Sequence, residues 1–213
     1  MRVYPIVKCI FDFIFSFIAI IVLSPLLLAI AIGIKLDCKG PVFFRQKRIG
    51  KYKKVFHILK FRTMTTDTPP NIPTHMLKTP DKFITKFGKF LRRTSLDELP
   101  QVFNILRGDM SIIGPRPALW NQCDLISARD KYGANDINPG LTGWAQVNGR
   151  DELPIDIKAK MDGEYVQRMG FGLDVKCFFA TIISVIKKDG VVEGGTTTLR
   201  IKENETSKAR ISI

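Results

Sequence analysis

Two adjacent carboxylates, Asp97 and Glu98, are the side chains in this sequence best suited to catalysis. The chain contains only two histidines, His57 and His75, and none of its four cysteines forms a CxxC pair. These counts exclude zinc clusters of the common kinds and leave little room for a Ser-His-Asp triad. The cysteines are expected to be reduced thiols. If the protein is an enzyme, carboxylates must supply its nucleophile and its acid and base groups.

Arginines near the two acids are suited to binding phosphate. Arg92 lies shortly before them, and Arg116 stands between two prolines in the segment Gly-Pro-Arg-Pro at residues 114–117. Flanking prolines fix the backbone and limit the directions in which the planar guanidinium can point, which suits phosphate oxygens. The glycine-rich residues 139–150 form a loop that can approach a ligand closely. This combination indicates a site where a metal ion and a phosphate group could meet.

The same two acids also fit a purely structural role. Ser95 followed by Glu98 is the pattern of a capping box, and acids in the first turn of a helix are stabilised by its dipole. Apolar residues at helical spacing follow, with a glycine suited to ending the helix: Leu99, Val102, Phe103, Leu106 and Gly108. The spacing alone leaves both interpretations open.

The elements that must position these residues begin with an apolar segment at residues 10–34, interrupted mainly by Asp12, Ser16 and Ser24. It exceeds the roughly 20 residues that a membrane helix needs and is too long for the apolar part of a secretory signal peptide. Pro25 lies within it, where proline kinks or breaks a helix. Basic residues flank both ends, so both ends favour the same side of the membrane. Two topologies remain open: a straight span, and a re-entrant hairpin that enters one leaflet and returns.

The rest of the chain is strongly basic. The 213 residues include 33 Lys and Arg against 20 Asp and Glu, a net charge of +13, although 45% of the residues are hydrophobic. Such a charge admits nucleic acid, anionic lipid or an acidic substrate as the partner. The aromatic residues gather in apolar and amphipathic segments instead of alternating with basic residues, which argues against nucleic acid. We expect much of the charge to hold the protein on an anionic membrane surface.

Beyond the apolar segment, the patterns indicate both strands and helices. Residues 41–44 and 55–61 fit two short strands around a basic turn, with His57 packed inside the second strand. A basic amphipathic helix is predicted from Asp81 through Arg93, its phenylalanines facing either the membrane interface or the core. A last helix is predicted at about residues 173–188. Residues 63–81 are predicted to form a loop because they are rich in proline and threonine.

Taken together, these motifs resemble those of the bacterial monotopic phosphoglycosyl transferases, sugar-phosphate transferases that start the assembly of membrane-linked glycans. The resemblance covers residues 8–188, nearly the whole chain. It rests on an ordered series of segments: Lys8 with Asp12, Ser24-Pro25, and residues 44–50 (Phe-Arg-Gln-Lys-Arg-Ile-Gly), 60–64 (Lys-Phe-Arg-Thr-Met), 95–101, 108–111, 114–117 and 139–150. So many matches in the same order are not expected by chance. The compact length is similar to that of the minimal catalytic members.

The resemblance implies an α+β fold in three parts. Residues 1–36 would form a re-entrant helix-break-helix membrane segment with its break at Ser24 and Pro25. Residues 37–190 would form a catalytic domain on the cytoplasmic face of the bacterial inner membrane, with interfacial amphipathic helices and a small antiparallel strand element. Residues 191–213 would form a polar tail.

The resemblance also implies a reaction: transfer of a sugar-1-phosphate from a UDP-sugar to polyprenol (undecaprenyl) phosphate, with release of UMP. This reaction initiates polysaccharide and glycoconjugate synthesis, including that of O-antigen. By family likeness Asp97 is the nucleophile, forms a covalent phosphosugar-aspartyl intermediate and binds Mg²⁺. Glu98 would be a second carboxylate near the metal or would assist the polyprenol phosphate. The implied substrate contacts are Arg92, Arg116, Gln46, Arg48, Asn148, Arg150 and Asp162, with Tyr165 beside the last.

Some features bear on substrate and partners. Asn138 stands where many relatives of this family have a basic residue, so a substrate contact there would be absent or replaced. Residues 148–154 resemble members that use N-acetylated amino sugars. The expected partners are the UDP-sugar, polyprenol phosphate and anionic lipids but not nucleic acid, while downstream glycosyltransferases and a second copy of the chain remain open. A different class stays in view: a membrane-anchored basic module that binds anionic lipid or nucleic acid without catalysis.

Overall fold

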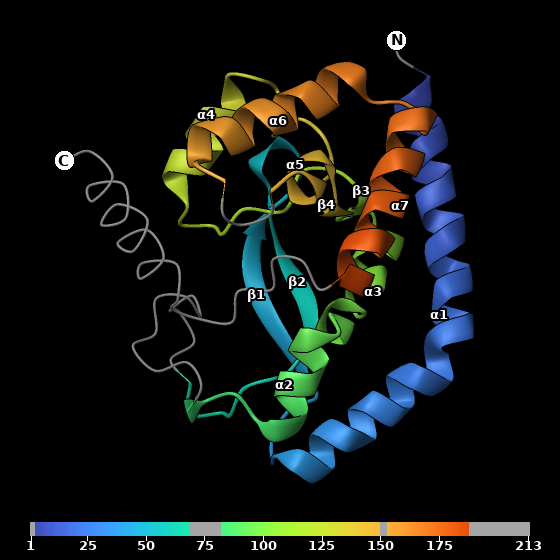
Figure 1. Ribbon diagram of the computed structural model, residues 1–213, viewed down its shortest axis with the longest axis vertical. Coiled ribbons are helices and arrows are strands. Elements are labelled where there is room, and N and C mark those ends of the chain that lie inside the picture. The colour runs from blue at the N-terminus through green and yellow to red at the C-terminus, as the bar shows by residue number, and fades with distance from the viewer. Residues whose placement is uncertain (1–2, 69–81, 150–152, 188–213) are drawn as a thin grey trace, which may run out of the picture.

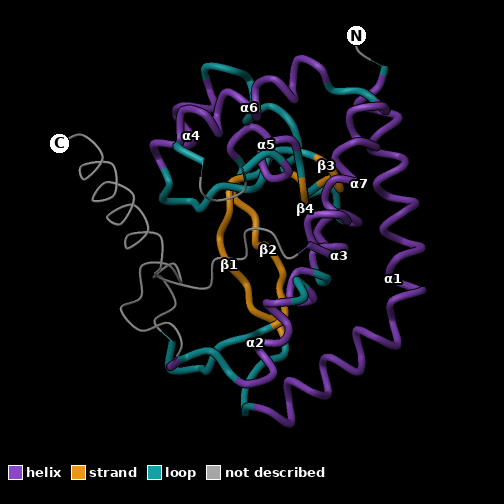
Figure 2. The backbone as a smooth tube through the Cα atoms, viewed as in Figure 1, coloured by secondary structure: helices purple, strands orange, loops and turns teal. Residues whose placement is uncertain are grey.

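The computed structural model describes residues 3–68, 82–149 and 153–187. The hairpin of strands β1, Phe43–Ile49, and β2, Val55–Phe61, lies at the centre (Figure 1). Helix α1, Tyr4–Asp37, runs along one side, and helices α4, Cys123–Asp130, and α6, Ile155–Arg168, cover one end. Helices make up most of the described chain, and the strands form two separate two-stranded sheets (Figure 2). The mixed helix and strand composition predicted from the sequence is confirmed. The predicted tail, residues 191–213, lies outside the described residues.

Helix α1, Tyr4–Asp37, is long and apolar enough to cross a membrane. It continues through Pro25 as one helix and bends part-way along (Figure 1). The proline cannot donate to the carbonyl of Ile21, one turn earlier, but the Ser24 hydroxyl donates to that carbonyl at 2.8 Å. The predicted break into two helices is therefore a bend within one helix, and the re-entrant topology stays a prediction.

The surface of α1 is apolar and mostly exposed, whereas two of its few polar residues, Asp12 and Ser16, are buried. Helix α7, Phe171–Lys187, exposes further large apolar side chains, among them Phe178, Phe179 and Ile183. Exposed apolar surface on this scale indicates membrane association.

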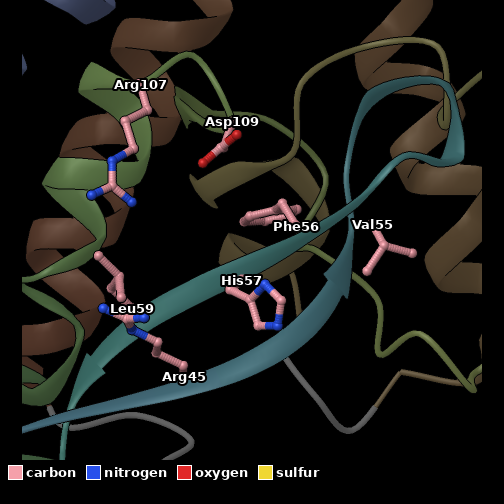
Figure 3. Close-up of a pocket in the computed structure, with 7 residues that line it drawn as sticks. All are labelled: Arg45, Val55, Phe56, His57, Leu59, Arg107 and Asp109. Atoms are coloured by element: carbon pink, nitrogen blue, oxygen red, sulfur yellow. The ribbon is translucent and has the colours of Figure 1, made fainter.

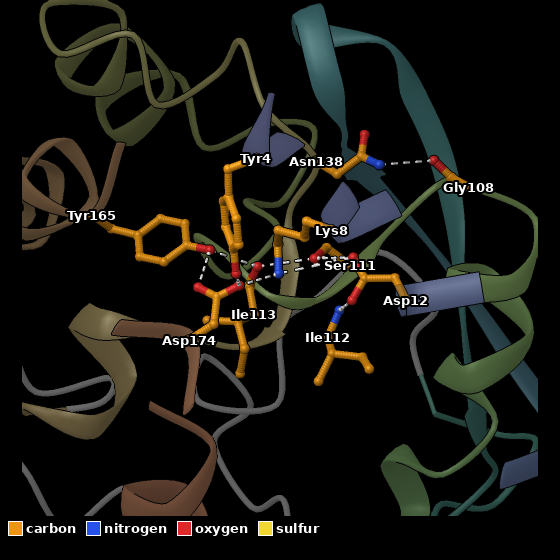
Figure 4. A network of polar contacts seen from close by, with 10 residues as sticks. All are labelled: Tyr4, Lys8, Asp12, Gly108, Ser111, Ile112, Ile113, Asn138, Tyr165 and Asp174. Atoms are coloured by element: carbon orange, nitrogen blue, oxygen red, sulfur yellow. Dashed lines mark hydrogen bonds and ion pairs between the residues drawn. The ribbon is translucent and has the colours of Figure 1, made fainter. Parts of the chain in front are cut away.

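A buried polar network ties the first turns of α1 to the rest of the protein (Figure 4). Asp12 accepts from the Ser111 hydroxyl at 2.6 Å and from the backbone N–H of Ile112. Lys8 binds the Asp174 carboxylate of α7 at 2.6 Å. Tyr4 and Tyr165 also donate to Asp174, each at 2.8 Å. The amino-terminal end of α1 is thus joined to α7 and to the strand that begins at Ser111.

The predicted hairpin is confirmed, with a longer first strand: β1, Phe43–Ile49, pairs antiparallel with β2, Val55–Phe61, across the short 3-10 helix η1, Lys51–Lys53. Residues opposite each other share one face of such a pair. Gln46 and Arg48 therefore lie on the same face as Lys60, whose opposite partner is Phe44. His57 lies on the other face and is exposed, so its predicted packing inside the strand is wrong.

Helix α2, Lys86–Arg93, begins later than predicted, because the Thr85 side chain caps it by accepting from the N–H of Gly88. Its apolar face packs on the second half of α1, where Leu91 joins a cluster with Ile30, Ile34 and Phe61. Only part of the predicted apolar face is exposed, at Phe90. Contact of α2 with a membrane interface stays a prediction.

The remaining elements form the end of the protein that carries α4 and α6. Strands β3, Ser111–Ile113, and β4, Gly140–Thr142, make a parallel pair that the sequence patterns did not predict. Around them lie α4, Cys123–Asp130, α5, Trp144–Val147, and α6, Ile155–Arg168. The cysteines are free thiols, as expected, and burial raises the pKa of Cys177 to about 11.

Candidate active site

The two predicted catalytic acids lie in a short 3-10 helix, η4, Leu96–Glu98, directly before α3, Gln101–Leu106. Ser95 precedes them in the left-handed region with φ of 56°, which is uncommon for a residue other than glycine. Its side chain makes no capping hydrogen bond. The capping-box interpretation is therefore wrong, and a strained turn presents the two acids.

Glu98 is held by two cations. Its Oε1 lies 2.6 Å from Lys60 Nζ of β2 and 2.8 Å from an Arg116 guanidinium nitrogen. Burial opposes the charge of Glu98, but Arg116 and Lys60 outweigh it and hold the pKa of this carboxyl well below its usual range. Glu98 is therefore ionised, and its oxygens are already engaged.

Asp97 has a different environment. It is half-buried, and its carboxylate makes no side-chain hydrogen bond or ion pair with the residues that the structure describes. Burial raises the pKa of Asp97, the negative charge of Glu98 adds to this effect, and Lys60, Arg92 and Arg116 act against it. Asp97 is thus an open carboxylate within the field of three cations.

The predicted phosphate contacts reach this region from separate elements. Arg92, near the end of α2, donates to the Thr63 hydroxyl at 2.8 Å and acts electrostatically on Asp97. Arg48 donates to the backbone carbonyl of Pro117, next to Arg116, and to the side chain of Gln46. The hairpin register places Gln46 and Arg48 on the face that carries Lys60. The structure therefore brings Arg92, Arg116, Gln46 and Arg48 to the side of the hairpin where the acids lie.

Asp162 occupies a different position from the one expected of a substrate contact. It is 1% exposed, and Arg129 of α4, 3% exposed, binds it through two nitrogens at 2.6 and 2.8 Å. Arg129 also donates to the backbone carbonyl of Arg116 at 3.0 Å. Asp162 lies behind the site and supports Arg116 through Arg129. Tyr165, 1% exposed, belongs to the buried network of Asp174.

The glycines of the two glycine-rich motifs serve close backbone packing. Gly140 donates to the carbonyl of Pro115 and Gly114 donates to that of Thr142, both at 2.8 Å. A Cβ on Gly140 would clash with the Gly114 nitrogen. The motif around Arg116 is therefore fixed against the start of residues 139–150. Of the other two residues predicted there, Asn148 is exposed and donates to the Trp144 carbonyl, and Arg150 lies outside the described residues.

Lys60 and Arg129 are site residues that the sequence patterns missed. Lys60 is one of many lysines in the chain, and only strand pairing reveals that it shares a face with Gln46 and Arg48. Arg129 lies on a helix with no strong apolar pattern, and its partner is distant in sequence. No local signal identifies it.

The protein side chains at this site could supply only some of the ligands that a divalent cation needs. No group of three or more His, Cys, Asp or Glu side chains that could hold a metal occurs among the described residues. Mg²⁺, however, is commonly bound by one or two carboxylates together with substrate phosphates and waters. Because Glu98 is engaged by cations, Asp97 is the carboxylate at this site suited to such an ion.

Comparison with known proteins gives a consistent family match. The sequence model of a family described as bacterial sugar transferase matches residues 3–188. The chain is 40% identical over 190 residues to the UDP-glucose:undecaprenyl-phosphate glucose-1-phosphate transferase of Xanthomonas campestris pv. campestris, covering 86% of this chain and 39% of that protein. It is 37% identical over 189 residues to the UDP-N-acetylgalactosamine-undecaprenyl-phosphate N-acetylgalactosaminephosphotransferase of Aeromonas hydrophila, covering 86% and 44%.

A third relative has a similar length to this chain. The uncharacterized sugar transferase EpsL of Bacillus subtilis (strain 168) is 35% identical over 196 residues, covering 91% of this chain and 94% of the relative. The chain thus spans about two fifths of the length of the first two relatives and nearly the whole of the third.

Proposed function

The chain belongs to the bacterial sugar transferase family, and from this premise we propose that it transfers a sugar-1-phosphate from a UDP-sugar to polyprenol phosphate and releases UMP. The relatives named for transfer to undecaprenyl phosphate support this reaction class. The observation that carries the proposal is the unequal environment of two adjacent carboxylates, one engaged by cations and one open.

Asp97 is the nucleophile in the first step. Its carboxylate oxygen attacks the phosphorus that bears the sugar, a new acyl-phosphate P–O bond forms, and the P–O bond to UMP breaks. UMP leaves with the bonding electron pair. Lys60, Arg92 and Arg116 lie around Asp97 and offset the negative charge that gathers on the phosphoryl oxygens. A covalent intermediate divides one difficult displacement into two easier steps.

In the second step, a phosphate oxygen of polyprenol phosphate attacks the same phosphorus. The bond to Asp97 breaks, which restores the free carboxylate and releases the sugar on a polyprenol diphosphate. This oxygen is already negative near neutral pH, so no side chain needs to remove a proton. Glu98 acts by holding Lys60 and Arg116, because both Oε1 contacts are ion pairs.

Asp97 would hold Mg²⁺ together with diphosphate oxygens of the donor. A bound Mg²⁺ supplies positive charge that neutralises the diphosphate. The protein contributes the carboxylate, and the three cations orient the phosphates around it.

The donor is a UDP-linked hexose or hexosamine. One relative above is named for glucose and another for N-acetylgalactosamine, so family membership permits both classes. The N-acetylated amino sugar expected from residues 148–154 therefore enters the test as one candidate in a panel. The protein would act on the cytoplasmic face of the inner membrane, with α1 and α7 in contact with lipid.

The test uses purified full-length protein in detergent or nanodiscs, with Mg²⁺, undecaprenyl phosphate and a panel of UDP-sugars. UMP release is measured for the wild type and for Asp97→Asn. We expect UMP formation with one or a few sugars, dependent on Mg²⁺, and a loss of at least about a thousandfold in Asp97→Asn, since a nucleophile is removed.

Trapping separates the nucleophile from a residue that merely binds. Wild-type protein incubated with donor alone should gain the mass of a sugar phosphate on the peptide that contains Asp97. Label on another residue, or full activity in Asp97→Asn, would contradict the assigned nucleophile. Absence of UMP with every donor, together with binding to anionic vesicles, would favour the noncatalytic membrane module.

A further inference from the structure

A cavity lies away from the two acids, along β2. It has a volume of about 510 Å³, within the range of small-molecule sites. Arg45 and His57 line it from the hairpin, and Arg107 and Asp109 line it from the segment that follows α3 (Figure 3). Val55, Phe56 and Leu59 add an apolar wall.

The cavity lies mainly on the face of the hairpin opposite to the proposed active site. Arg45 pairs with Leu59, and Lys47 pairs with His57, so these four side chains share the face opposite to that of Gln46 and Lys60. Phe56, whose opposite partner is Arg48, lines the cavity from the other face, but Lys60, Asp97, Glu98 and Arg116 do not line it. The cavity is not part of the catalytic site.

The nitrogen-bearing side chains of the cavity have free donors. Among the described residues, the side chains of Arg45, Arg107 and His57 make no hydrogen bond or ion pair. Other arginines of the fold are engaged: Arg62 donates to two backbone carbonyls and Arg129 binds Asp162. The guanidinium groups of Arg45 and Arg107 lie on the same side of the cavity (Figure 3). Two planar forks with free N–H groups match the oxygens of one phosphate group.

Two of the strand residues that line the cavity, His57 and Leu59, are held by Asn104 of α3. Its amide accepts from the N–H of Leu59 at 2.9 Å and donates to the carbonyl of His57 at 2.8 Å, which fixes the edge of β2. The same amide nitrogen lies 3.4 Å from Asp109. The Asp109 carboxylate lines the same cavity as the two arginines, and an acceptor there suits a ligand hydroxyl.

We propose that this cavity is a second anion site, which binds a phosphate that carries a glycerol-like hydroxyl group through Arg45 and Arg107, with Asp109 accepting from the hydroxyl. This chemistry is shared by the headgroup of an anionic glycerophospholipid and by a soluble phosphate ester. The site is additional to the donor and acceptor sites of the proposed transferase reaction, and it does not depend on that reaction.

The soluble source is tested with glycerol 3-phosphate as the probe. The parent protein is the full-length chain with Arg116→Gln, which weakens phosphate binding at the proposed active site. It is kept in neutral detergent at constant ionic strength. Hydrogen–deuterium exchange is followed at residues 55–59 and 104–109 during the titration. We expect protection of these segments, with a dissociation constant at least about tenfold higher when Arg45→Gln and Arg107→Gln are added.

The lipid source is tested in nanodiscs of phosphatidylcholine with and without phosphatidylglycerol. Protection of the same segments only with phosphatidylglycerol assigns the site to a membrane lipid, and protection only with glycerol 3-phosphate assigns it to a soluble ester. Either result supports the site if the arginine pair is required.

The matched control is Lys131→Gln with Lys160→Gln, which removes the same charge from exposed positions outside the cavity and outside the predicted interfacial helix. It should bind both probes as the parent protein does. Equal losses in both double variants would show an effect of bulk charge and overturn the proposal. The proposal would also be overturned if neither glycerol 3-phosphate nor phosphatidylglycerol protects these segments in a folded parent protein.

Discussion

Replacing Asp97 with Asn should make the fold more stable while it removes the proposed nucleophile. Burial raises the pKa of Asp97, so its charged form is less favourable in the folded than in the unfolded chain. This destabilisation is absent below about pH 4, where the unfolded carboxyl is protonated, and is complete above the raised folded pKa. Asp97→Asn should therefore raise the unfolding midpoint near pH 7, and the gain should shrink towards pH 4. The unfolding midpoint is measured from the fluorescence of the two tryptophans in Mg²⁺-free buffer.

Glu98→Gln should have the opposite effect on stability. The lowered pKa of Glu98 means that its charge stabilises the fold at all pH values above its unfolded pKa. The substitution leaves Lys60 and Arg116 without their carboxylate, which costs about 1–3 kcal/mol. Activity should fall as well, because two cations lose their position. An Asp97→Asn variant that is less stable than Glu98→Gln under the same conditions would contradict both assignments.

At the scale of elements, the buried pair of α4 and α6 should govern activity through the position of Arg116. Arg129→Met or Asp162→Leu alone leaves a buried charge without its partner and should destabilise the fold by about 3–5 kcal/mol. The double variant Arg129→Met/Asp162→Leu should recover most of this stability, since apolar pairs replace buried ion pairs well. The double variant should still lose activity, because the Arg116 carbonyl then lacks the hydrogen bond that Arg129 donates and Arg116 loses its position.

Measuring both the stability and the activity of these variants shows whether the Arg129–Asp162 pair positions Arg116 or serves only the fold. Full activity in the stable double variant would show that the pair serves folding alone. Lys53→Met provides the control, because Lys53 and Asp130 form an exposed ion pair and such pairs contribute little. This variant should keep both stability and UMP release.

The elements also show what local sequence can reveal. The hairpin and α7 were predictable because alternating or helical apolar patterns mark them within a few residues. The turn at Ser95 was not predictable in this way. Ser95 and Glu98 have the spacing of a capping box, but in the fold Lys60 and Arg116, which are distant in sequence, bind the Glu98 carboxylate. The parallel pairing of β3 with β4 joins residues far apart in the chain, and each strand has only three residues. Pairing of that kind leaves no local pattern.

At the scale of the molecule, both ends of α1 contact one folded body. Near the first end, Lys8 binds Asp174 of α7 and Asp12 binds Ser111 of β3. Near the other end, Ile30 and Ile34 pack on Phe61 and Leu91. A straight span separates its ends by the hydrocarbon core of about 30 Å, with the rest of the protein on one side. The contacts at both ends therefore favour the re-entrant topology, which the sequence alone left open because its flanks are basic on both sides.

Cysteine labelling tests this topology directly. Val3→Cys and Lys39→Cys are placed one at a time in a chain whose Cys9, Cys38 and Cys123 are replaced by Ser, while the buried Cys177 is kept. With a membrane-impermeant maleimide, a re-entrant helix predicts that both sites react in inside-out vesicles and neither in right-side-out vesicles. Lys8→Met should weaken the attachment of the first end without changing the hydrophobic length of α1, so Val3→Cys should then react from either side in part of the molecules. If Val3→Cys and Lys39→Cys react from opposite sides in the otherwise intact chain, α1 is a straight span and its contacts with α7 cannot form in the membrane.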